Sequence, residues 1–198
     1  MGLSSEILIA LALGYLLGSI PFGLFFAWIS GGGDVRKIGS GGIGATNVLR
    51  TGKKWPAAAT LFFDAAKGAA AILLAGHFWG QDAGIAAALG VILGHLFPAW
   101  LKFKGGKGVA TAFGVLLTFH WPVGLIAAAT WLGVAVITRL SSLSALVTCL
   151  VAPVAMYLLG QTAYVTVTAV IAALVIVMHH ANIRRLLNGT EPRIGSKK

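Results

Sequence analysis

The stretch VATAFGVLLTFHWPVGLIAAATWLGVAVITR, residues 109–139, decides how many times the chain can cross a membrane. It is predominantly apolar before its final Arg139 and is interrupted at His120-Trp121-Pro122. Proline cannot continue a helix without losing a backbone hydrogen bond, so we expect two helices, Val109–Phe119 and Pro122–Ile137. The first is too short to cross a bilayer directly, and we expect it to be re-entrant or packed inside a helical bundle.

The rest of the chain has the composition of a membrane protein. Of its 198 residues, 58% are hydrophobic and 10% are charged, whereas about a quarter of the residues in a typical soluble domain are charged. Apolar stretches need about 20 residues to span the bilayer as helices. We therefore predict an all-α polytopic membrane protein that forms a single domain over residues 1–198, with seven transmembrane helices. The five further spans are Ser5–Ile29, Trp55–Phe78, Ala83–Trp100, Leu143–Leu159 and Ala163–His179.

The basic residues predict the orientation of these spans. The chain has 15 Lys+Arg against 5 Asp+Glu. If there are seven spans, every lysine and arginine except Lys67 lies on the same side of the membrane. Because cytoplasmic loops carry the excess of Lys and Arg, we expect the N-terminus outside and the C-terminus in the cytoplasm. Their place in short loops between spans argues against nucleic acid as a partner. They are Arg36, Lys37, Arg50, Lys53, Lys54, Lys102, Lys104, Lys107, Arg139, Arg184, Arg185, Arg193, Lys197 and Lys198.

A glycine-rich segment, GSGGIGATNVLR at residues 39–50, follows the first span. Glycines allow backbone N–H groups to converge on an anion. Ser40, Thr46 and Asn47 add side-chain donors, and the Arg50 guanidinium is a planar fork suited to phosphate. We expect these residues and Gly41 to bind phosphate. The segment also fits the dinucleotide pattern G-x-G-x-x-G, but no βαβ unit surrounds it, so we exclude that interpretation.

A second segment, FKGGKGVAT at residues 103–111, follows the third span. It is not a P-loop, because a glycine follows Lys107 where Ser or Thr is required. Its physical character is similar, with Gly105 and Gly106 permitting close approach and Lys104 and Lys107 supplying positive charge. A helix that starts near Val109 would also attract anions through its free N–H groups.

Near the end of the third span stands His95, for which three roles stay open. It could make a hydrogen bond between packed helices, act as a base or donate to phosphate. Ser142 lies at the start of the sixth span, where it is either a helix N-cap or a phosphate donor. Asp64 and Lys67 lie three residues apart on the second span, so we expect them to share a helix face and neutralise each other.

The third polar segment, HHANIRRLLNGTE at residues 179–191, follows the last span. A basic amphipathic helix on the membrane surface is one interpretation, which we adopt for Lys197 and Lys198. For His179, Asn182 and Arg185 we favour a place in the phosphate site. The segment has no paired carboxylates, and the chain has no cysteine cluster or H-E-x-x-H motif, so we expect no metal and no cofactor.

Together these segments resemble the bacterial acyl-phosphate-dependent glycerol-3-phosphate 1-O-acyltransferases of the PlsY type. The likeness rests on residues 39–50, Gly94-His95, residues 103–111 and the stretch NIRRLLNGTE at residues 182–191. The sequence departs from the family pattern at two places. Gly42-Ile43 stands where the family usually has Asn-Pro, and His180-Ala181 stands where it usually has Arg and Glu.

The resemblance implies transfer of a fatty acyl group from acyl phosphate to the 1-hydroxyl of glycerol 3-phosphate, the first acylation of phospholipid synthesis. The products would be lysophosphatidic acid and phosphate, with an upstream enzyme forming the acyl phosphate. It also implies a site in the bacterial cytoplasmic (inner) membrane that faces the cytoplasm. Ser40, Lys107, His179 and Asn182 would then be catalytic. Phosphate would be bound by Gly41, Thr46, Asn47, Arg50, His95, Lys104, Gly105, Gly106, Ser142 and Arg185.

Two other classes of function stay open from the residues alone. A small transporter of an anionic phosphorylated solute would explain the spans and the basic loops. It would not explain why glycines and cations cluster on one face, because a transport path needs polar groups through the membrane midplane. A structural membrane subunit would leave the glycine-rich loops without a purpose.

Overall fold

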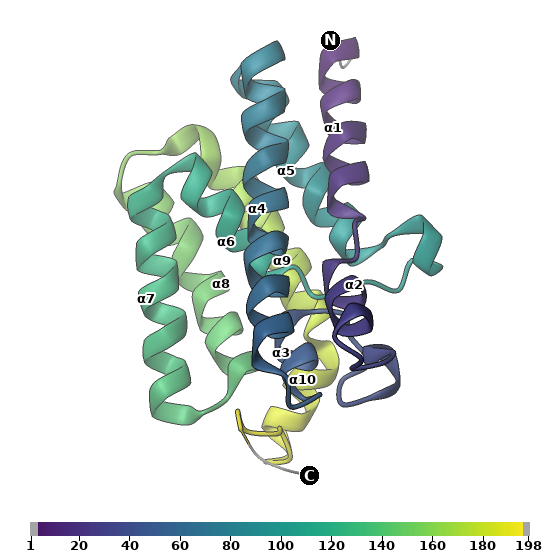
Figure 1. The fold of residues 1–198 in the computed structure, drawn as a ribbon. Helices are drawn as coiled ribbons and strands as arrows, with labels where there is room; N and C mark the ends of the chain where they lie inside the picture. Colours follow the sequence, from purple (N-terminus) through teal and green to yellow (C-terminus); the bar gives the residue numbers. More distant parts are fainter. Residues whose placement is uncertain (1–3, 196–198) are drawn as a thin grey trace. The chain divides into compact units, whose positions relative to one another are not determined.

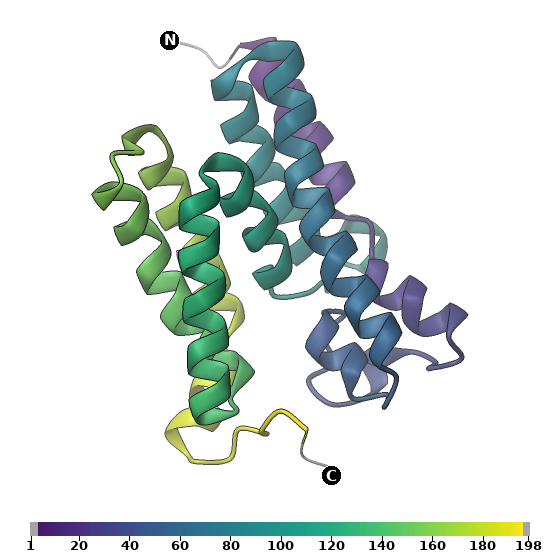
Figure 2. The same cartoon turned by 60° about the vertical axis from the view of Figure 1, so that its left-hand side comes forward.

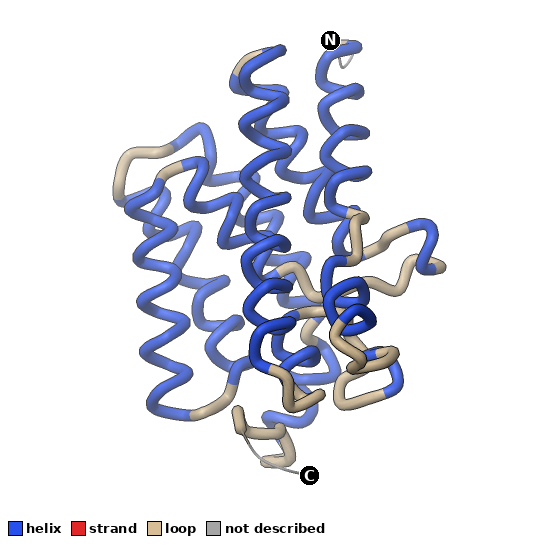
Figure 3. Tube along the Cα trace, viewed as in Figure 1, coloured by secondary structure: helices blue, strands red, loops and turns tan. Residues whose placement is uncertain are grey.

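The computed structural model describes residues 4–195, and within that range the chain forms helices and loops without a strand (Figure 3). It divides into two compact units, residues 1–118 and 119–198. Lys197 and Lys198, which the sequence assigns to the membrane surface, lie outside the described residues. The all-helical prediction is therefore confirmed for the described part of the chain.

The first unit is built from six α-helices and two short 3-10 helices among the described residues (Figure 1). The four longer apolar helices form its framework, and the short helices lie in the loops between them. In chain order they are α1 (Ser5–Gly18), α2 (Phe22–Ile29), η1 (Val35–Lys37), α3 (Ala45–Leu49), α4 (Lys54–Trp79), α5 (Gln81–Leu96), η2 (Ala99–Leu101) and α6 (Val109–Phe119).

The second unit contains α7 (Trp121–Thr138), α8 (Ser141–Leu158), α9 (Thr162–Met178) and α10 (His180–Leu187). Neighbouring helices along the chain pack against each other, first α7 on α8 and then α8 on α9 (Figure 2). At its start, the Phe119 ring stacks on Tyr164 with ring centroids 4.4 Å apart. The chain bends by 61° between α9 and α10, so α10 leaves the axis of the last apolar helix.

Five segments are long and apolar enough to cross a membrane, or six if the bent pair α9–α10 counts as one span. The helix at Val109–Phe119 has the predicted bounds and is a shorter apolar helix of 11 residues. His120 separates it from α7, as the proline at position 122 indicated. The six segments and this shorter helix overlap the seven predicted spans. Seven membrane crossings and the orientation of the termini stay predictions.

The predicted span Ser5–Ile29 is broken into two helices, which the sequence analysis did not anticipate. Helix α1 ends at Gly18, and α2 begins after Pro21. Proline has no N–H to donate to the preceding turn and disfavours helical dihedrals in the residue before it. The break at residues 19–21 follows, and within it the carbonyl of Ile20 accepts the Phe22 N–H at 3.1 Å and the Lys67 ammonium at 2.9 Å.

Glycines allow α1 and α5 to pack with their backbones in contact. A Cβ atom on Gly14 or Gly18 would overlap the carbonyls of Ala87 and Val91 in α5. The converse holds for Gly90 and Gly94 in α5, where a Cβ would overlap the backbone of α1. Each helix thus carries a G-x-x-x-G pair, the spacing that brings membrane helices close together.

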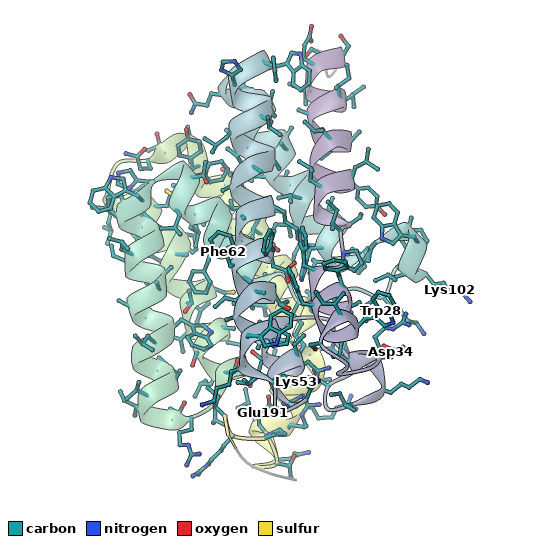
Figure 4. The ribbon with its side chains drawn as sticks, in the orientation of Figure 1. Trp28, Asp34, Lys53, Phe62, Lys102 and Glu191 are labelled. Carbon is teal, nitrogen blue, oxygen red and sulfur yellow. The ribbon has the colours of Figure 1, made fainter. Side chains whose placement is uncertain are left out.

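The outer surface of the first unit is strongly apolar. Trp28 is 75% exposed and Phe62 is 67% exposed, and both point away from the helices that carry them (Figure 4). Large exposed aromatic residues are costly in water, whereas a bilayer supplies an apolar environment for them. This surface agrees with an integral membrane protein.

Candidate active site

The buried side chain of Asn47 organises the first glycine-rich loop. Its amide nitrogen donates to the carbonyl oxygens of Val35 and Gly42 at 2.7 Å and of Ile38 at 3.2 Å. Its Oδ1 accepts a hydrogen bond from the backbone N–H of Ser40 at 3.1 Å. The loop therefore wraps around this amide. The Asn47 amide that the sequence offered to phosphate therefore binds loop carbonyls instead.

Arg50 is held at the edge of the same loop. Its Nη1 donates to Asn47 Oδ1 at 3.2 Å, and the residue is exposed. Gly39 lies beside both side chains with a φ of +54°, and a Cβ there would overlap Asn47 Oδ1 and the Arg50 side chain. Only glycine fits this left-handed position. A guanidinium carries five N–H donors, so one bond to Asn47 leaves capacity for an anion.

The second glycine-rich loop is pinned to the end of α5. The backbone N–H groups of Gly105 and Gly106 donate to the carbonyls of Leu96 and His95, each at 3.0 Å. Carbonyls at a helix C-terminus have no partner within the helix, so these bonds satisfy them. The same bonds engage two amides that the sequence analysis assigned to phosphate.

The cationic part of this loop lies on either side of the pinned glycines. Lys104 is exposed and Lys107 is half-buried. Helix α6 begins at Val109, after Gly108 with a φ of +83°, as the sequence predicts. The first N–H groups of a helix lack intrahelical acceptors and favour anions. The loop thus brings two lysines close to the start of a helix.

A hollow of about 370 Å³ lies between the two loops, within the first unit. Its lining joins Gly41 of the first loop to Lys104 of the second, together with Arg36, Trp100, Leu101 and Lys102. Lys102 extends outward from the loop after α5 (Figure 4). This combination of cations with aromatic and aliphatic surface suits an anion that carries an apolar group.

Asp34 partly neutralises one cation of this hollow. Its carboxylate accepts from Arg36 Nε at 2.9 Å and from Nη2 at 2.8 Å. The side-chain hydrogen bond from Arg36 lowers the pKa of Asp34 to about 2, and the backbone N–H of Arg36 adds to it. The carboxylate therefore stays ionised at neutral pH. Most of the unpaired positive charge at the hollow comes from the two lysines, Lys102 and Lys104.

In the second unit, the third polar segment gathers around Glu191. Oε1 accepts from Ser142 Oγ at 2.7 Å and from Asn182 Nδ2 at 2.6 Å. Oε2 accepts from Arg185 Nε at 2.7 Å. Ser142 is therefore not a helix N-cap, because α8 has Leu140 at that position. Three residues that the sequence analysis gave to phosphate share this carboxylate.

The charge on Glu191 is stabilised by these three donors. Burial acts to raise the pKa of Glu191, but the hydrogen bonds from Ser142, Asn182 and Arg185 outweigh burial and lower that pKa below its ordinary value. Hydrogen bonds to the ionised form of a carboxyl favour that form. The carboxylate is thus a fixed negative charge that holds α8, α10 and the C-terminal segment together.

His179 lies at the junction of α9 and α10 and is buried. Its Nδ1 lies 2.7 Å from the carbonyl oxygen of Val175, one turn earlier in α9. If Nδ1 donates to that carbonyl, Nε2 becomes the acceptor in the neutral ring. A histidine in this tautomer can take a proton from a hydroxyl group.

Comparison with known proteins decides the family of the chain. A family model for glycerol-3-phosphate acyltransferase matches residues 8–189 and so extends over both units. A glycerol-3-phosphate acyltransferase of Brucella canis is 59% identical over 188 residues, covering 95% of this chain and 93% of its own length. One of Rhodopseudomonas palustris is 57% identical over 189 residues, covering 96% of both chains.

The chain belongs to the glycerol-3-phosphate acyltransferase family.

A solved structure of this family has the same fold. The crystal structure of PlsY, an integral membrane glycerol 3-phosphate acyltransferase, in its glycerol 3-phosphate form matches with a TM-score of 0.90 and 38% identity. The match covers 96% of both chains. A second structure of PlsY, in its lysophosphatidic acid form, matches with a TM-score of 0.89 and 37% identity. The resemblance to the PlsY type is thereby confirmed, and the protein is an integral membrane acyltransferase.

Within the acyltransferase, the predicted site residues gather in two sets. Ser40, Gly41, Thr46, Asn47 and Arg50 share the first loop and Lys104, Gly105, Gly106 and Lys107 share the second, all in the first unit. Ser142, His179, Asn182 and Arg185 belong to the second unit. Contacts of these residues with a substrate stay predictions.

The surroundings of His95 favour one of its three predicted roles. It is 3% exposed and lies behind the second loop, where a Cβ on Gly106 would overlap its Nε2. Its Nδ1 lies 3.6 Å from Asp64 Oδ1. A role in packing between helix and loop fits this position better than direct contact with phosphate.

Glu191 contacts three of the predicted site residues but was not itself among them. The signal was present, because this acid stands in a basic segment and lies within ten residues of Asn182 and Arg185. Patterns of anion-binding residue types do not include a carboxylate, so they do not point to Glu191. Glu191 orders anion-binding side chains, but its own charge is negative.

Proposed function

We propose that this acyltransferase moves a fatty acyl group from acyl phosphate to the 1-hydroxyl of glycerol 3-phosphate, releasing lysophosphatidic acid and phosphate. The observation that carries the proposal is the hollow shared by the two glycine-rich loops, with Gly41 on one side and Lys104 on the other. Both proposed substrates carry phosphate, and one carries a long apolar chain. A cationic hollow in an apolar helical framework matches that chemistry.

The related structures support the choice of substrate. PlsY has been crystallised in a glycerol 3-phosphate form and in a lysophosphatidic acid form. The acyl donor is inferred from chemistry. Acyl phosphate is an activated mixed anhydride, so transfer needs no covalent intermediate on the enzyme and no metal or organic cofactor.

In the proposed step, the 1-hydroxyl oxygen of glycerol 3-phosphate attacks the carbonyl carbon of acyl phosphate. The bond between that carbon and the phosphate oxygen breaks, and inorganic phosphate leaves with the electron pair. The hydroxyl proton passes to a phosphate oxygen of a substrate or to His179. Lys107 and backbone N–H groups stabilise the carbonyl oxyanion and the departing phosphate.

The other residues then hold the two phosphates. Arg50, Ser40 and Thr46 act from the first loop, and Lys104 acts from the second. Asn47, Gly105 and Gly106 shape these loops through the bonds described above, and Asn182 and Arg185 are oriented by Glu191. We place the site at the cytoplasmic face of the bacterial inner membrane, where the basic loops lie if the positive-inside rule holds.

Purified protein in detergent, given acyl phosphate and glycerol 3-phosphate with no other protein, tests the proposal. We expect phosphate release that depends on glycerol 3-phosphate, with an equal amount of lysophosphatidic acid. Lys107→Ala should lower kcat by about 100-fold or more, while Lys54→Ala, which removes an exposed cation from the start of α4, should retain activity. Glycerol 3-phosphate uptake into sealed vesicles without phosphate release would overturn the enzyme proposal in favour of transport.

A further inference from the structure

Three ionisable side chains lie buried together between α4 and α5. Lys67 Nζ lies 2.6 Å from Asp64 Oδ1, with side chains 3% and 2% exposed. His95 Nδ1 lies 3.6 Å from the same carboxylate oxygen, and its side chain is 3% exposed. Ionisable groups inside a membrane bundle are costly and mark functional positions by default. None of the three lines the hollow, so the proposed chemistry does not use them directly.

On one side, the cluster fixes the break between α1 and α2. Lys67 Nζ donates to the carbonyl oxygen of Ile20 at 2.9 Å, which lies in the break before Pro21 and also accepts the Phe22 N–H at 3.1 Å. The ammonium also lies 5.6 Å from the centroid of the Phe22 ring, the first residue of α2. Lys67 therefore holds the start of α2, which Pro21 defines, against α4.

Helix α2 in turn supports the first glycine-rich loop. Gly23 packs against the carbonyl oxygen of Ile43 so closely that a Cβ at position 23 would overlap it. Ile43 is 2% exposed and lies inside the loop, beside the Gly42 carbonyl that Asn47 binds. A shift of α2 would therefore move the loop that carries Ser40 and Arg50.

On the other side, the cluster supports the second loop through His95. The imidazole fills the space behind Gly106, and the His95 carbonyl accepts the Gly106 N–H at 3.0 Å. Asp64 faces His95 Nδ1, so the carboxylate connects the ring to Lys67. The same three residues thus contact the supports of both loops that border the hollow.

We propose that Asp64, Lys67 and His95 are positioning residues that hold the two glycine-rich loops at the separation needed to bind glycerol 3-phosphate. The inference rests on the proposed function, because it assigns a purpose to the separation between these loops. A purely stabilising pair does not account for the arrangement. Apolar residues of similar volume stabilise a protein as well as a buried ion pair, and often better.

Neutral replacements separate positioning from stability. Asp64→Asn and Lys67→Met each leave one buried group without its charged partner, so each single variant should lose thermal stability. The double variant Asp64→Asn/Lys67→Met removes both charges at similar volume and should regain the melting temperature of the wild type in detergent. It still lacks the ammonium that binds the Ile20 carbonyl.

We expect the double variant to keep this stability and yet lose about 10–100-fold in kcat/KM for glycerol 3-phosphate, mostly through a higher KM. Amide hydrogen exchange at residues 105–106 should be faster, because the loop behind His95 is loosened. The matched control is Thr148→Val in α8, which removes a buried hydroxyl that donates to Ser144 O of its own helix. Thr148→Val should change neither the kcat/KM for glycerol 3-phosphate nor the amide exchange at residues 105–106.

A double variant with wild-type melting temperature, wild-type KM and unchanged exchange at residues 105–106 would overturn the positioning role. Failure of the proposed function has a different signature, because the wild type itself would release no phosphate. Hydrogen exchange and titration with glycerol 3-phosphate need no acyl transfer. In that case, faster exchange and weaker binding in the double variant would still support the positioning role.

Discussion

The amide nitrogen of Asn182 lies 2.6 Å from Oε1 of Glu191, so a residue proposed for catalysis is oriented by a carboxylate nine residues later. The same carboxylate binds Ser142 and Arg185. A carboxylate beside a phosphate site would repel the phosphate unless its charge were compensated. Arg185 compensates the charge of Glu191 through an ion pair at 2.7 Å.

Replacing Glu191 with Gln should destabilise the protein by about 2 kcal/mol, since hydrogen bonds to a charged group contribute more than neutral ones. Activity should fall as well, because Asn182 and Arg185 lose their common partner. Thermal unfolding in detergent and phosphate release measure the two effects. Glu6→Gln, at the exposed start of α1, provides the matched control, and equal stability of the two variants would contradict the assignment.

The lowered pKa of Glu191 predicts a dependence on pH. The pKa of Glu in an unfolded chain is about 4.3, and the pKa of Glu191 in the folded protein lies below its unfolded value. The stabilisation is therefore fully present above the unfolded pKa and is lost as the pH falls through the folded pKa. Melting temperatures between pH 3 and pH 7 should fall more steeply for the wild type than for Glu191→Gln. Parallel curves would exclude this carboxyl as the cause.

Asn47→Asp should disrupt the first loop more than its small chemical change suggests. The substitution removes the amide donor to three carbonyls and turns a carboxylate oxygen towards them, which should cost about 1–3 kcal/mol. We expect a higher KM for glycerol 3-phosphate together with a lower melting temperature. The same substitution at exposed Asn188, beyond α10, should have neither effect, and an unchanged KM in Asn47→Asp would show that the loop tolerates the loss.

Gly106→Ala should push the second loop away from α5, because the added methyl group would overlap the His95 imidazole. We expect a loss of about 100-fold in kcat/KM, the scale expected when binding groups are displaced by about 1 Å. Gly133→Ala serves as a control, since a Cβ there meets nothing within 4 Å. Retained activity in Gly106→Ala would indicate that Lys104 and Lys107 do not depend on this contact.

Gly90→Val should prevent α1 and α5 from packing, because the backbone of α1 occupies the space that the side chain needs. Overpacking of this kind costs about 1–3 kcal/mol in protein cores, and here it opposes contact between two backbones. Folded yield and melting temperature in detergent report the effect. Gly76→Val in α4 adds the same side chain where nothing lies within 4 Å, so comparable losses in both variants would refute the packing argument.

Much of the fold follows from local sequence signals. The break before Pro122, the short helix Val109–Phe119 and the Asp64–Lys67 pair each depend on residues a few positions apart, and all three are confirmed. The break at residues 19–21 carried a comparable signal in Pro21. The apolar composition continues through this break, and hydropathy alone does not detect a break that stays apolar.

The site is harder to derive from sequence because it depends on which way each polar group faces. Asn47 has the residue type of a phosphate donor, yet its amide turns inward to the loop carbonyls. Gly105 and Gly106 have the residue type of an anion nest, yet their amides close the end of α5. Residue type states what a group can bind, and only the folded loop decides which partner it receives.

The four glycines between α1 and α5 also limit how this protein can change over evolution. No amino acid is smaller than glycine, so any single substitution at these positions adds atoms where the two backbones are in contact. The packing of α1 on α5 therefore cannot change through a series of tolerated single substitutions. Sequence differences within this family should therefore be concentrated on the surfaces that face lipid, because fluid lipid chains adapt to apolar side chains of different shapes.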